Sequence, residues 1–411
     1  MGLGYIGLPV ASMLASRGHE VIGVDVKPSV VASIQQGKSH FFEPDLQMLL
    51  TAAISTGQLV ARATPVEADY YILAVPTPFV GDHKPDLSYV TAATEAIAPF
   101  LRPGSTIVLE STSPVGTTER IAANVAKARP DLRVPGYKDT TGEHDIFIAH
   151  CPERILPGQM VRELVDNDRI IGGMSDACSE KALQLYESFV RGASYLTDCR
   201  TAEFVKLIEN AFRDVNIAFA NELSVICDKL DIDVWGAIKL ANKHPRVNIL
   251  QPGAGVGGHC IAVDPWFIID SAPKESRIIR AARDVNDGKP HEVVRQILAH
   301  AERFKAPTIA CYGVTYKPDV EDIRESPALE IVRLLAKHDS VKIVVCDPLI
   351  AELPADLASC KNVTRADPDK ARDQADIVAF LVGHKSFKRL PPNKFLNKVV
   401  VDAIGLLSAE R

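Results

Sequence analysis

A glycine-rich run at residues 2–7 constrains the fold of this chain more than any other feature. It fits the pattern Gly-x-Gly-x-x-Gly, and the apolar residues 8–16 that follow it predict a helix. Residues 20–25 predict a strand ending at Asp25, at roughly the 20-residue interval that is typical of dinucleotide-binding units. Glycines at these positions allow a tight turn and let a pyrophosphate approach the helix N-terminus. Because the Asp25 carboxylate would accept hydrogen bonds from ribose hydroxyls and repel a 2′-phosphate, we predict NAD rather than NADP as the cofactor.

The strand that normally precedes such a glycine run is missing, because the chain starts at the run itself. That strand is normally central to the sheet, and its loss would leave its neighbours unpaired. We therefore expect the sequence to be truncated at its N-terminus. The alternative is that the cofactor domain is compromised.

Further strands alternate with helices along the chain. Residues 70–75 and 106–110 are short apolar runs that end close to Thr77 and Thr112. Continuous apolar strands separated by helices indicate a parallel sheet covered on both faces. Ligands gather at the carboxyl ends of such strands, which places both threonines at a binding edge.

The fold class predicted for the chain is α/β, in three parts. Residues 1–196 are expected to form a Rossmann-like NAD domain without its first strand. Residues 197–292 are expected to form a central helical dimerisation domain, because residues 200–230 contain neither glycine nor proline and have helical apolar spacing. Residues 293–411 contain a second series of strands and helices and predict a smaller Rossmann-like domain.

Composition excludes several functions. The net charge of −6 argues against general nucleic-acid binding, and the sequence contains no apolar run near the roughly 20 residues needed to cross a membrane. The chain also lacks a signal-peptide pattern, and its eight scattered cysteines suit a reducing cytoplasm. The eleven histidines form no metal-binding motif, so we predict no metal.

A cysteine in a second glycine-rich loop is the strongest candidate for catalysis. Four glycines in residues 252–265 remove side chains around Cys260, which lets a bulky ligand approach both the backbone and the sulfur. An exposed thiol together with a nicotinamide site suggests an oxidation through a covalent thioester. The alternative is that Cys260 simply packs in a turn, since free cysteines are usually buried.

Polar residues on the long predicted helix form a second candidate group. Lys206, Asn210 and Arg213 lie at positions i, i+4 and i+7, on one stripe of the helix. Such a stripe can hold an oxyanion, a water and a carboxylate, although a solvated polar face is the alternative. Asp264 could share a water or a proton with Lys206, or could be only a turn residue before a proline. Glu153 and the arginine after it could meet substrate at the sheet edge or merely form a surface pair.

These residues resemble a known family, the nucleotide-sugar 6-dehydrogenases, which includes the UDP-glucose dehydrogenases. The similarity extends from Gly2 to about Asp402. It is carried by the runs 76–83, 110–116, 151–154, 209–216, 244–248, 257–260 and 324–327. Members of the family are α/β enzymes that oxidise the C6 alcohol of a sugar to a carboxylate with two NAD and one water.

The resemblance implies roles for the catalytic candidates. Lys206, directly or through water with Asp264, would remove the hydroxyl proton while hydride leaves to NAD. Cys260 would then attack the aldehyde, because an aldehyde donates no hydride readily until a nucleophile adds. The thiohemiacetal would give a second hydride and form a thioester. Water held near Thr112, Glu153 and Asp264 would hydrolyse that thioester, and Asn210 completes the predicted catalytic set.

The resemblance also implies two binding sites and a dimer. The predicted NAD-binding residues are Gly2, Gly4, Tyr5, Ile6, Gly7, Asp25, Thr77, Thr118 and Arg324. The predicted UDP-sugar-binding residues are Arg154, Ile155, Lys206, Asn210, Arg213, His244, Arg246, Gly257, Tyr316 and Lys317. In the family one arginine reaches into the site of the partner subunit, and Arg246 matches it, so we expect a homodimer.

Two features of the sequence bear on which sugar is oxidised. The glucose enzymes usually have serine where this chain has His259, and the N-acetylglucosamine enzymes tend to lack the His-Pro-Arg run found at 244–246. We therefore predict UDP-N-acetyl-D-mannosamine as the substrate, with a uronate product used in bacterial surface polysaccharides. The alternatives are UDP-glucose, UDP-N-acetylglucosamine, or an inactive truncated protein that only binds a nucleotide sugar.

Overall fold

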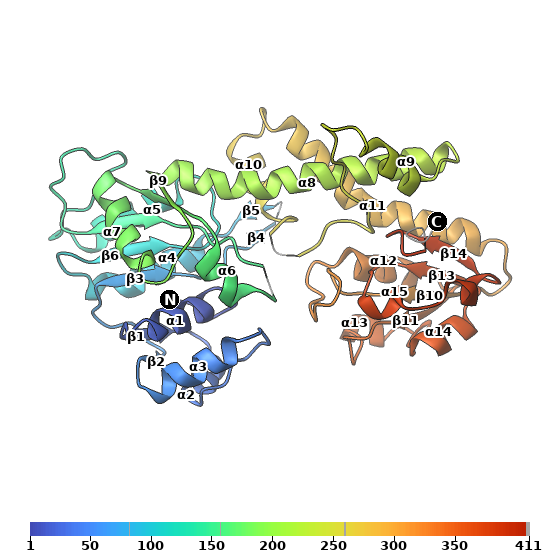
Figure 1. Ribbon diagram of the computed structural model, residues 1–411, viewed down its shortest axis with the longest axis horizontal. Helices are drawn as coiled ribbons and strands as arrows, with labels where there is room; N and C mark the ends of the chain where they lie inside the picture. Colours follow the sequence, from blue (N-terminus) through green and yellow to red (C-terminus); the bar gives the residue numbers. More distant parts are fainter. Residues whose placement is uncertain (82, 157, 259, 408–411) are drawn as a thin grey trace. The chain divides into compact units, whose positions relative to one another are not determined.

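The computed structural model describes residues 1–81, 83–156, 158–258 and 260–407, and His259 therefore lies outside the described residues. The chain forms two compact units, Met1–Glu209 and Asn210–Arg411. The long helix α8 (Cys199–Lys229) begins in the first unit and ends in the second (Figure 1). It confirms the helix predicted over residues 200–230.

The first unit is built from short strands separated by helices. Its strands are β1 (Val21–Val24), β2 (Leu59–Arg62), β3 (Tyr70–Leu73), β4 (Phe79–Val80), β5 (Lys84–Pro85), β6 (Thr106–Leu109), β7 (Phe147–His150), β8 (Arg169–Gly173) and β9 (Ser194–Asp198). Its helices before α8 are α1 (Gly7–Ser16), α2 (Pro28–Gln35), α3 (Leu46–Ser55), α4 (Ser88–Ile97), the 3₁₀ turn η1 (Ala98–Phe100), α5 (Thr117–Ala128), α6 (Met160–Asp166) and α7 (Asp176–Tyr186).

The strands of this unit form a main sheet in the order β3-β6-β7-β8-β9 and a separate pair, β1-β2. Residues at the start of the chain lie between the two. Ala74 N donates to the Met1 carbonyl at 2.9 Å, and Gly2 N donates to the Val24 carbonyl at 2.8 Å. The edges of β1 and β3, which the sequence predicted to lack a central partner, therefore share hydrogen bonds with these first residues.

One strand pair departs from the predicted parallel sheet. β8 pairs antiparallel with β7, whereas β3, β6 and β7 are parallel to one another and β9 is parallel to β8. The chain between β7 and β8 leaves the sheet and re-enters it at the same end of the strands, so β8 has to run in the opposite direction to β7. Apolar patterning marks a strand as buried but does not encode this direction.

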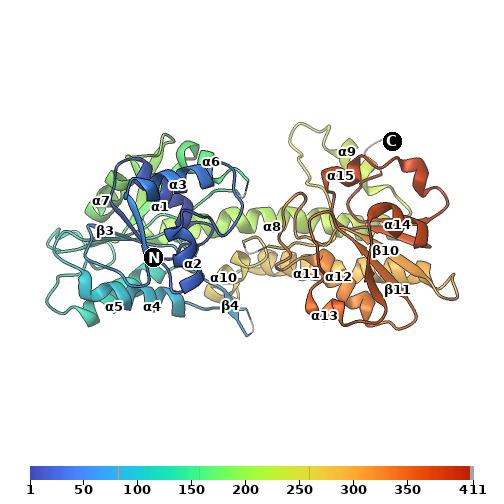
Figure 2. The same cartoon turned by 90° about the horizontal axis from the view of Figure 1, so that it is seen from below.

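Helices cover both faces of the main sheet of the first unit (Figure 2). Ile107 and Leu109 of β6 pack on residues of α4 and α5. The alternate residue, Val108, faces residues of α1 and α7. Because successive side chains of a strand point to opposite faces, this alternation confirms the predicted sheet covered on both sides.

The second unit contains a long helical part and a second sheet. Its helices after α8 are α9 (Val234–Ala241), α10 (Asp264–Ser271), α11 (Arg277–Ala301), α12 (Pro327–Ala336), α13 (Ala355–Ala358), α14 (Pro368–Gln374), α15 (Lys385–Lys388) and the 3₁₀ turn η2 (Pro392–Phe395). Its strands are β10 (Thr308–Tyr312), β11 (Lys342–Cys346), β12 (Val363–Arg365), β13 (Ile377–Phe380) and β14 (Val399–Asp402).

The sheet of the second unit is wholly parallel, in the order β12-β11-β10-β13-β14. Ile309 and Cys311 face the core shared with α11 and α12, while Ala310 and Tyr312 face the core shared with α14, α15 and η2. The chain order reverses between β10 and β13. In open α/β sheets, ligands bind beyond the carboxyl ends of the strands at this reversal point.

Within the described part of the chain, no helix is both long enough and apolar enough to cross a membrane.

Candidate functional site

The glycine run of the first unit lies between β1 and β3. Gly2 adopts a φ of +86°, and a side chain at Gly7 would collide with the Gly2 carbonyl oxygen. The Asp25 carboxylate, at the end of β1, accepts a hydrogen bond from Leu3 N at 2.9 Å and another from Lys27 N at 2.9 Å. The structure therefore brings the predicted glycines and the predicted ribose-binding carboxylate together at the start of α1.

Side chains near this run are open to ligand. Tyr5 is 42% exposed, and its ring lies 4.4 Å from that of Phe41, centroid to centroid. Ile6 is half-buried and packs at the edge of the α1 core. A tight backbone that excludes side chains, a helix N-terminus and an acidic strand end are the parts that a dinucleotide needs. The residues present thus fit NAD.

The loops after β3 and β6 are joined by side-chain hydrogen bonds. Thr77 Oγ1 donates to the Thr112 carbonyl at 2.6 Å, and Ser111 Oγ donates to the Val75 carbonyl at 2.6 Å. Both threonines are half-buried. Two residues predicted separately, one for NAD and one for the hydrolytic water, therefore lie on a single joined edge.

Glu203 of α8 fixes the far end of the loop after β6. Its carboxylate accepts hydrogen bonds from Gly116 N at 2.7 Å, from Thr118 N at 2.7 Å and from Thr118 Oγ1 at 2.6 Å. Burial raises the pKa of Glu203 to about 7, although these hydrogen bonds oppose the shift. Thr118, predicted to contact NAD, is fully buried and engaged with Glu203. Glu203 was not among the predicted residues, because its only signal in the sequence is a carboxylate on the apolar face of a helix.

Glu153 follows β7 and is held by a buried ion pair. Its Oε2 atom lies 2.6 Å from Arg169 Nη1, and its Oε1 atom accepts from Arg154 N at 2.7 Å. Arg154 itself pairs with Glu209 of α8 at 2.7 Å and is partly exposed. Glu153 is therefore not the surface residue that the sequence left open, whereas Arg154 does form a partly exposed pair. Ile155 is half-buried beside the sheet core.

Behind Glu153 lies a buried group of ionisable side chains. The Arg169 guanidinium is 5.3 Å from the Tyr186 ring centroid, and Tyr186 Oη donates to Glu110 Oε1 at 2.7 Å. Burial, and then the nearby Glu153 carboxylate, raises the pKa of Glu110 to about 7. Burial lowers the pKa of Arg169, but the acidic groups around it, Glu153 foremost, together raise that pKa by more. The guanidinium thus remains charged beside Glu153.

In the second unit, three predicted catalytic residues lie together. The Cys260 carbonyl accepts from Asp264 N at 2.9 Å, so the cysteine lies one turn before Asp264, which is the first residue of α10. Asn210 Nδ2 donates to Asp264 Oδ2 at 2.5 Å, and both side chains are buried. Cys260 is exposed, while every other cysteine is buried or half-buried. The exposed Cys260 thiol is thus one turn away from the buried Asp264 carboxylate. One hydrogen bond joins that carboxylate to the Asn210 amide.

The glycines before Cys260 let its loop pack on another loop. A side chain at Gly258 would lie 2.8 Å from the Tyr316 ring, and one at Gly255 would lie 2.7 Å from Pro327. A side chain at Gly257 would collide with the Glu325 carbonyl oxygen. The glycines therefore serve close loop packing, in addition to the access to the thiol that the sequence predicted.

The remaining predicted substrate residues are polar and mostly open to solvent. Tyr316 and Lys317 are half-buried on the loop that follows β10, at the reversal point of the second sheet. Arg324, farther along that loop and predicted to contact NAD rather than the sugar, is exposed and pairs with Asp322 at 2.6 Å. Three more are exposed on α8 and after α9, namely Arg213, His244 and Arg246. Lys206 belongs to the first unit, so its predicted role beside Cys260 stays a prediction.

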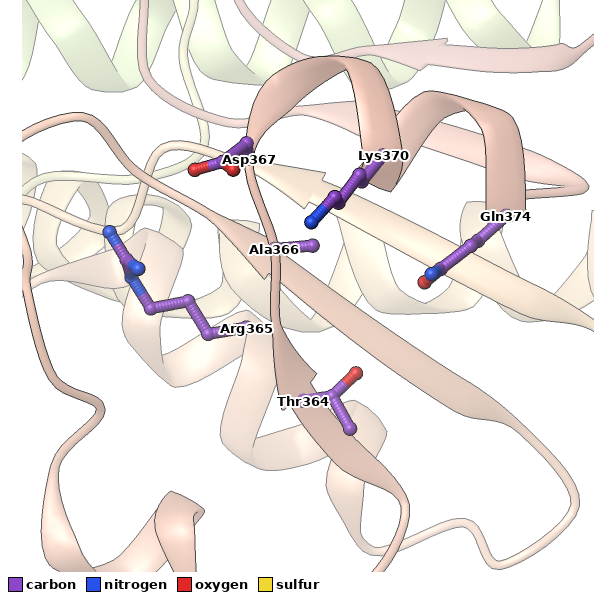
Figure 3. A pocket seen from close by; sticks show the side chains of 6 residues that line it. All are labelled: Thr364, Arg365, Ala366, Asp367, Lys370 and Gln374. Atoms are coloured by element: carbon purple, nitrogen blue, oxygen red, sulfur yellow. The ribbon is translucent and has the colours of Figure 1, made fainter.

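A surface pocket of about 380 Å³ lies elsewhere, beside β12 and α14 (Figure 3). Its lining comprises Thr364, Arg365, Ala366, Asp367, Lys370 and Gln374. None of the predicted site residues lines it. The pocket is thus separate from the glycine-rich loop that leads to Cys260 (the thiol loop, residues 252–260) and from the loop after β10.

Comparison with known proteins matches each part of the chain to one family. Residues 1–190 match the NAD binding domain of the UDP-glucose/GDP-mannose dehydrogenase family, residues 200–288 match its central domain, and residues 310–409 match its UDP binding domain. The chain belongs to this family. It is therefore an NAD-dependent nucleotide-sugar dehydrogenase, as its motifs predicted.

Several relatives match over nearly their whole length. A UDP-N-acetyl-D-mannosamine dehydrogenase from Campylobacter jejuni is 54% identical over 97% of this chain and 97% of its own. An NDP-N-acetyl-D-galactosaminuronic acid dehydrogenase from Ralstonia nicotianae is also 54% identical, over 100% of this chain and 96% of its own. The structure of UDP-N-acetyl-mannosamine dehydrogenase from Staphylococcus aureus superposes with a TM-score of 0.84 at 41% identity, covering 98% of this chain and 93% of that one.

Proposed function

We propose that this enzyme oxidises UDP-N-acetyl-D-mannosamine at C6 to the uronate, with two NAD and one water. The arrangement of Cys260, Asp264 and Asn210 carries the proposal, because it combines an exposed nucleophile with a buried carboxylate. The similarity to enzymes named for this substrate supports the choice of sugar. The proposed reaction is the family's oxidation of an alcohol to an acid, which needs two hydride transfers.

The residues divide the chemistry between them. NAD, when bound, supplies the hydride acceptor for each oxidation. Lys206 takes the proton of the C6 hydroxyl, directly or through water with Asp264, and its cation stabilises the oxyanion that forms when Cys260 adds to the aldehyde. The loss of a second hydride leaves an acyl group on the Cys260 sulfur. Water then hydrolyses this thioester, releases the uronate and returns the thiol.

Glu153 and Thr112 are proposed to serve the hydrolytic water. The ion pair with Arg169 keeps the Glu153 carboxylate in one orientation, and the Thr77 hydroxyl fixes the backbone beside Thr112. A positioned carboxylate can accept a proton from water as it attacks. Asp264, which Asn210 orients, is the third residue proposed to hold this water.

A second substrate has specific support, because the Ralstonia relative is as similar as the Campylobacter one and is named for N-acetylgalactosaminuronic acid. NADH formation should therefore be measured with the UDP derivatives of N-acetylmannosamine, N-acetylgalactosamine, N-acetylglucosamine and glucose. We expect the highest kcat/KM with UDP-N-acetylmannosamine and two NADH per sugar. A higher kcat/KM with UDP-N-acetylgalactosamine would identify that sugar, rather than UDP-N-acetylmannosamine, as the substrate. No turnover with any of the four would reject the proposed activity.

We further propose a homodimer, with Arg246 reaching the partner's site. The support is an apolar stripe along α8, which Leu230 continues just after the helix; the exposed members on the helix are Phe204, Ile208, Phe212, Phe219 and Ile226. Exposed apolar residues at helical spacing on one helix are typical of an interface. Light scattering on the wild type and on Phe212→Glu/Phe219→Glu tests this, and a monomeric wild type would reject it. A cytoplasmic enzyme remains our prediction from composition.

A further inference from the structure

One loop carries residues predicted for both ligands. Residues 313–326 leave β10 at the reversal point of the second sheet and include Tyr316, Lys317 and Arg324. We propose that His384 is a positioning residue that holds this loop, and through it the thiol loop, in the shape that binds the nucleoside diphosphate of the substrate. The inference rests on the proposed function and adds to it a residue outside the predicted site.

The His384 ring is fully buried, and each of its nitrogens has a defined partner. Nδ1 accepts a hydrogen bond from Asp319 N at 3.0 Å, so this nitrogen carries no proton. Nε2 lies 3.2 Å from Asp347 Oδ2 and donates to it. A neutral ring with its proton on Nε2 therefore connects the middle of the loop to the end of β11.

Asp347 extends this connection to the start of the loop. It is the residue directly after β11, and its Oδ2 atom also accepts from Val314 N at 2.7 Å. The backbone at Val314 and the backbone at Asp319 are thus tied to the same His-Asp pair. Between these two ties lie Tyr316 and Lys317, which have little freedom to move while both hold.

The backbone at Asp319 requires such support. Its φ is +60°, a left-handed conformation that is unfavourable for a residue with a side chain. Its amide is held by His384, and its Oδ1 atom accepts from Lys385 N at 3.0 Å. His384, which caps α15, and Lys385, its first residue, therefore hold the turn in a conformation that it would otherwise leave.

The same contacts exclude a hydrolytic role for this group. Thr315 Oγ1 lies 3.2 Å from His384 Nε2, which is the nitrogen that also faces Asp347. In a nucleophilic triad the hydroxyl and the carboxylate contact opposite ring nitrogens. Thr315 Oγ1 instead donates to the Lys317 carbonyl at 3.0 Å, which shapes the turn that presents Lys317.

The held loop supports the thiol loop directly. The Tyr316 ring and the Glu325 carbonyl occupy the space that side chains at Gly258 and Gly257 would fill. A shift of residues 314–319 would therefore reach the backbone that precedes Cys260. Small displacements at supporting residues are known to weaken binding and catalysis in functional sites.

The test is calorimetric titration of the full-length protein with UDP alone, which requires no catalysis. We expect His384→Ala to raise the Kd for UDP about tenfold. His384→Asn should recover part of the affinity, because its amide oxygen can accept from Asp319 N. Asp347→Asn changes the other side of the pair and should also raise the Kd, which provides a second variant should His384→Ala fail to fold.

Phe395→Leu is the matched control, because Phe395 is buried in the same unit and packs on Tyr312 and Phe380 rather than on the loop. It should lower the Tm without changing the Kd for UDP. In steady state, the His384 variants should raise the KM for the UDP-sugar more than they lower kcat. A wild-type Kd in the folded His384 and Asp347 variants would overturn the inference. Failure of the wild type to bind UDP would instead contradict the proposed function.

Discussion

The Asn210 amide donates a hydrogen bond of 2.5 Å to the Asp264 carboxylate, and both side chains are almost completely buried. Asn210 lies on α8 and Asp264 is the first residue of α10, so the bond joins two helices through residues that are 54 positions apart in sequence. Asp264 N in turn donates to the Cys260 carbonyl. The Asn210 amide thus orients the carboxylate of Asp264, which lies four residues after the proposed nucleophile, Cys260.

Asp264→Asn tests the charge of this carboxylate. The substituted amide can still present an oxygen to Asn210 Nδ2, so packing is kept while the negative charge is lost. Loss of a positioned acid-base group typically costs about 10²–10⁴-fold in rate. We expect kcat to fall by at least roughly 100-fold with a Tm close to that of the wild type. A variant with wild-type kcat would exclude Asp264 from proton transfer.

Cys260→Ser tests the covalent step. Serine is a weaker nucleophile, so the first oxidation should proceed while the second stalls. Rapid-quench measurement should give about one NADH per active site and no steady turnover. Cys360→Ser is the matched control, since Cys360 is the half-exposed cysteine outside the site, and it should retain wild-type turnover. Continued uronate production by Cys260→Ser would rule out the thioester route.

Much of the fold could be predicted because its strands are short apolar runs bounded by glycine, proline or charge. The strands expected at 70–75 and 106–110, for example, are β3 (Tyr70–Leu73) and β6 (Thr106–Leu109). Helix α11 was not predicted, because a glycine at 288 and Pro290 interrupt its pattern. In the structure the helix continues through Pro290, which is buried against the thiol loop. Tertiary packing here overrides a local helix breaker.

The site was predictable where residues are close in sequence or lie on a strand end. Cys260 and Asp264 share one turn, and the Asp25 carboxylate meets the glycine run because both lie at the edge of β1. The supporting residues were not predictable, because Glu203 and His384 act on loops far from them in sequence. Their side chains carry no periodic signal in the sequence. Only the folded structure shows which backbone amides donate hydrogen bonds to them.

Gly7→Ala tests the glycine run. A methyl group at Gly7 would collide with the Gly2 carbonyl oxygen, so the turn that receives the pyrophosphate must open. We expect at least a tenfold rise in the Kd for NAD, measured by calorimetry. Gly136→Ala is the matched control in the same unit, because a methyl group there meets no atom within 4 Å. Unchanged NAD affinity in Gly7→Ala would contradict the assignment of the run.

Arg169→Met tests the buried ion pair with Glu153. Removing one partner leaves a buried charge, which typically costs roughly 3–5 kcal/mol of unfolding free energy. Arg102→Met is the matched control, because its pair with Asp69 is largely exposed and contributes about 1 kcal/mol or less. Urea unfolding should separate the two variants. If Glu153→Gln in the Arg169→Met background restores no stability, the loss does not come from the unpaired carboxylate.

Glu110→Gln tests the buried carboxyl beneath this pair through the pH dependence of stability. The pKa of Glu110 is raised by burial from 4.5 to about 7. Between these two values the folded protein retains a proton that the unfolded chain has released, so stability falls as pH rises through this window. The full loss above pH 7 is on the order of 3 kcal/mol.

Glutamine at position 110 does not titrate, and it keeps an oxygen for the Tyr186 hydroxyl, which in the wild type donates to Glu110 Oε1. We therefore expect Glu110→Gln to gain unfolding free energy relative to the wild type between pH 5 and pH 8, whereas Glu67→Gln, at an exposed position, should show no such gain. Parallel stability profiles for the wild type and Glu110→Gln would show that Glu110 is already ionised at pH 5 in the folded protein.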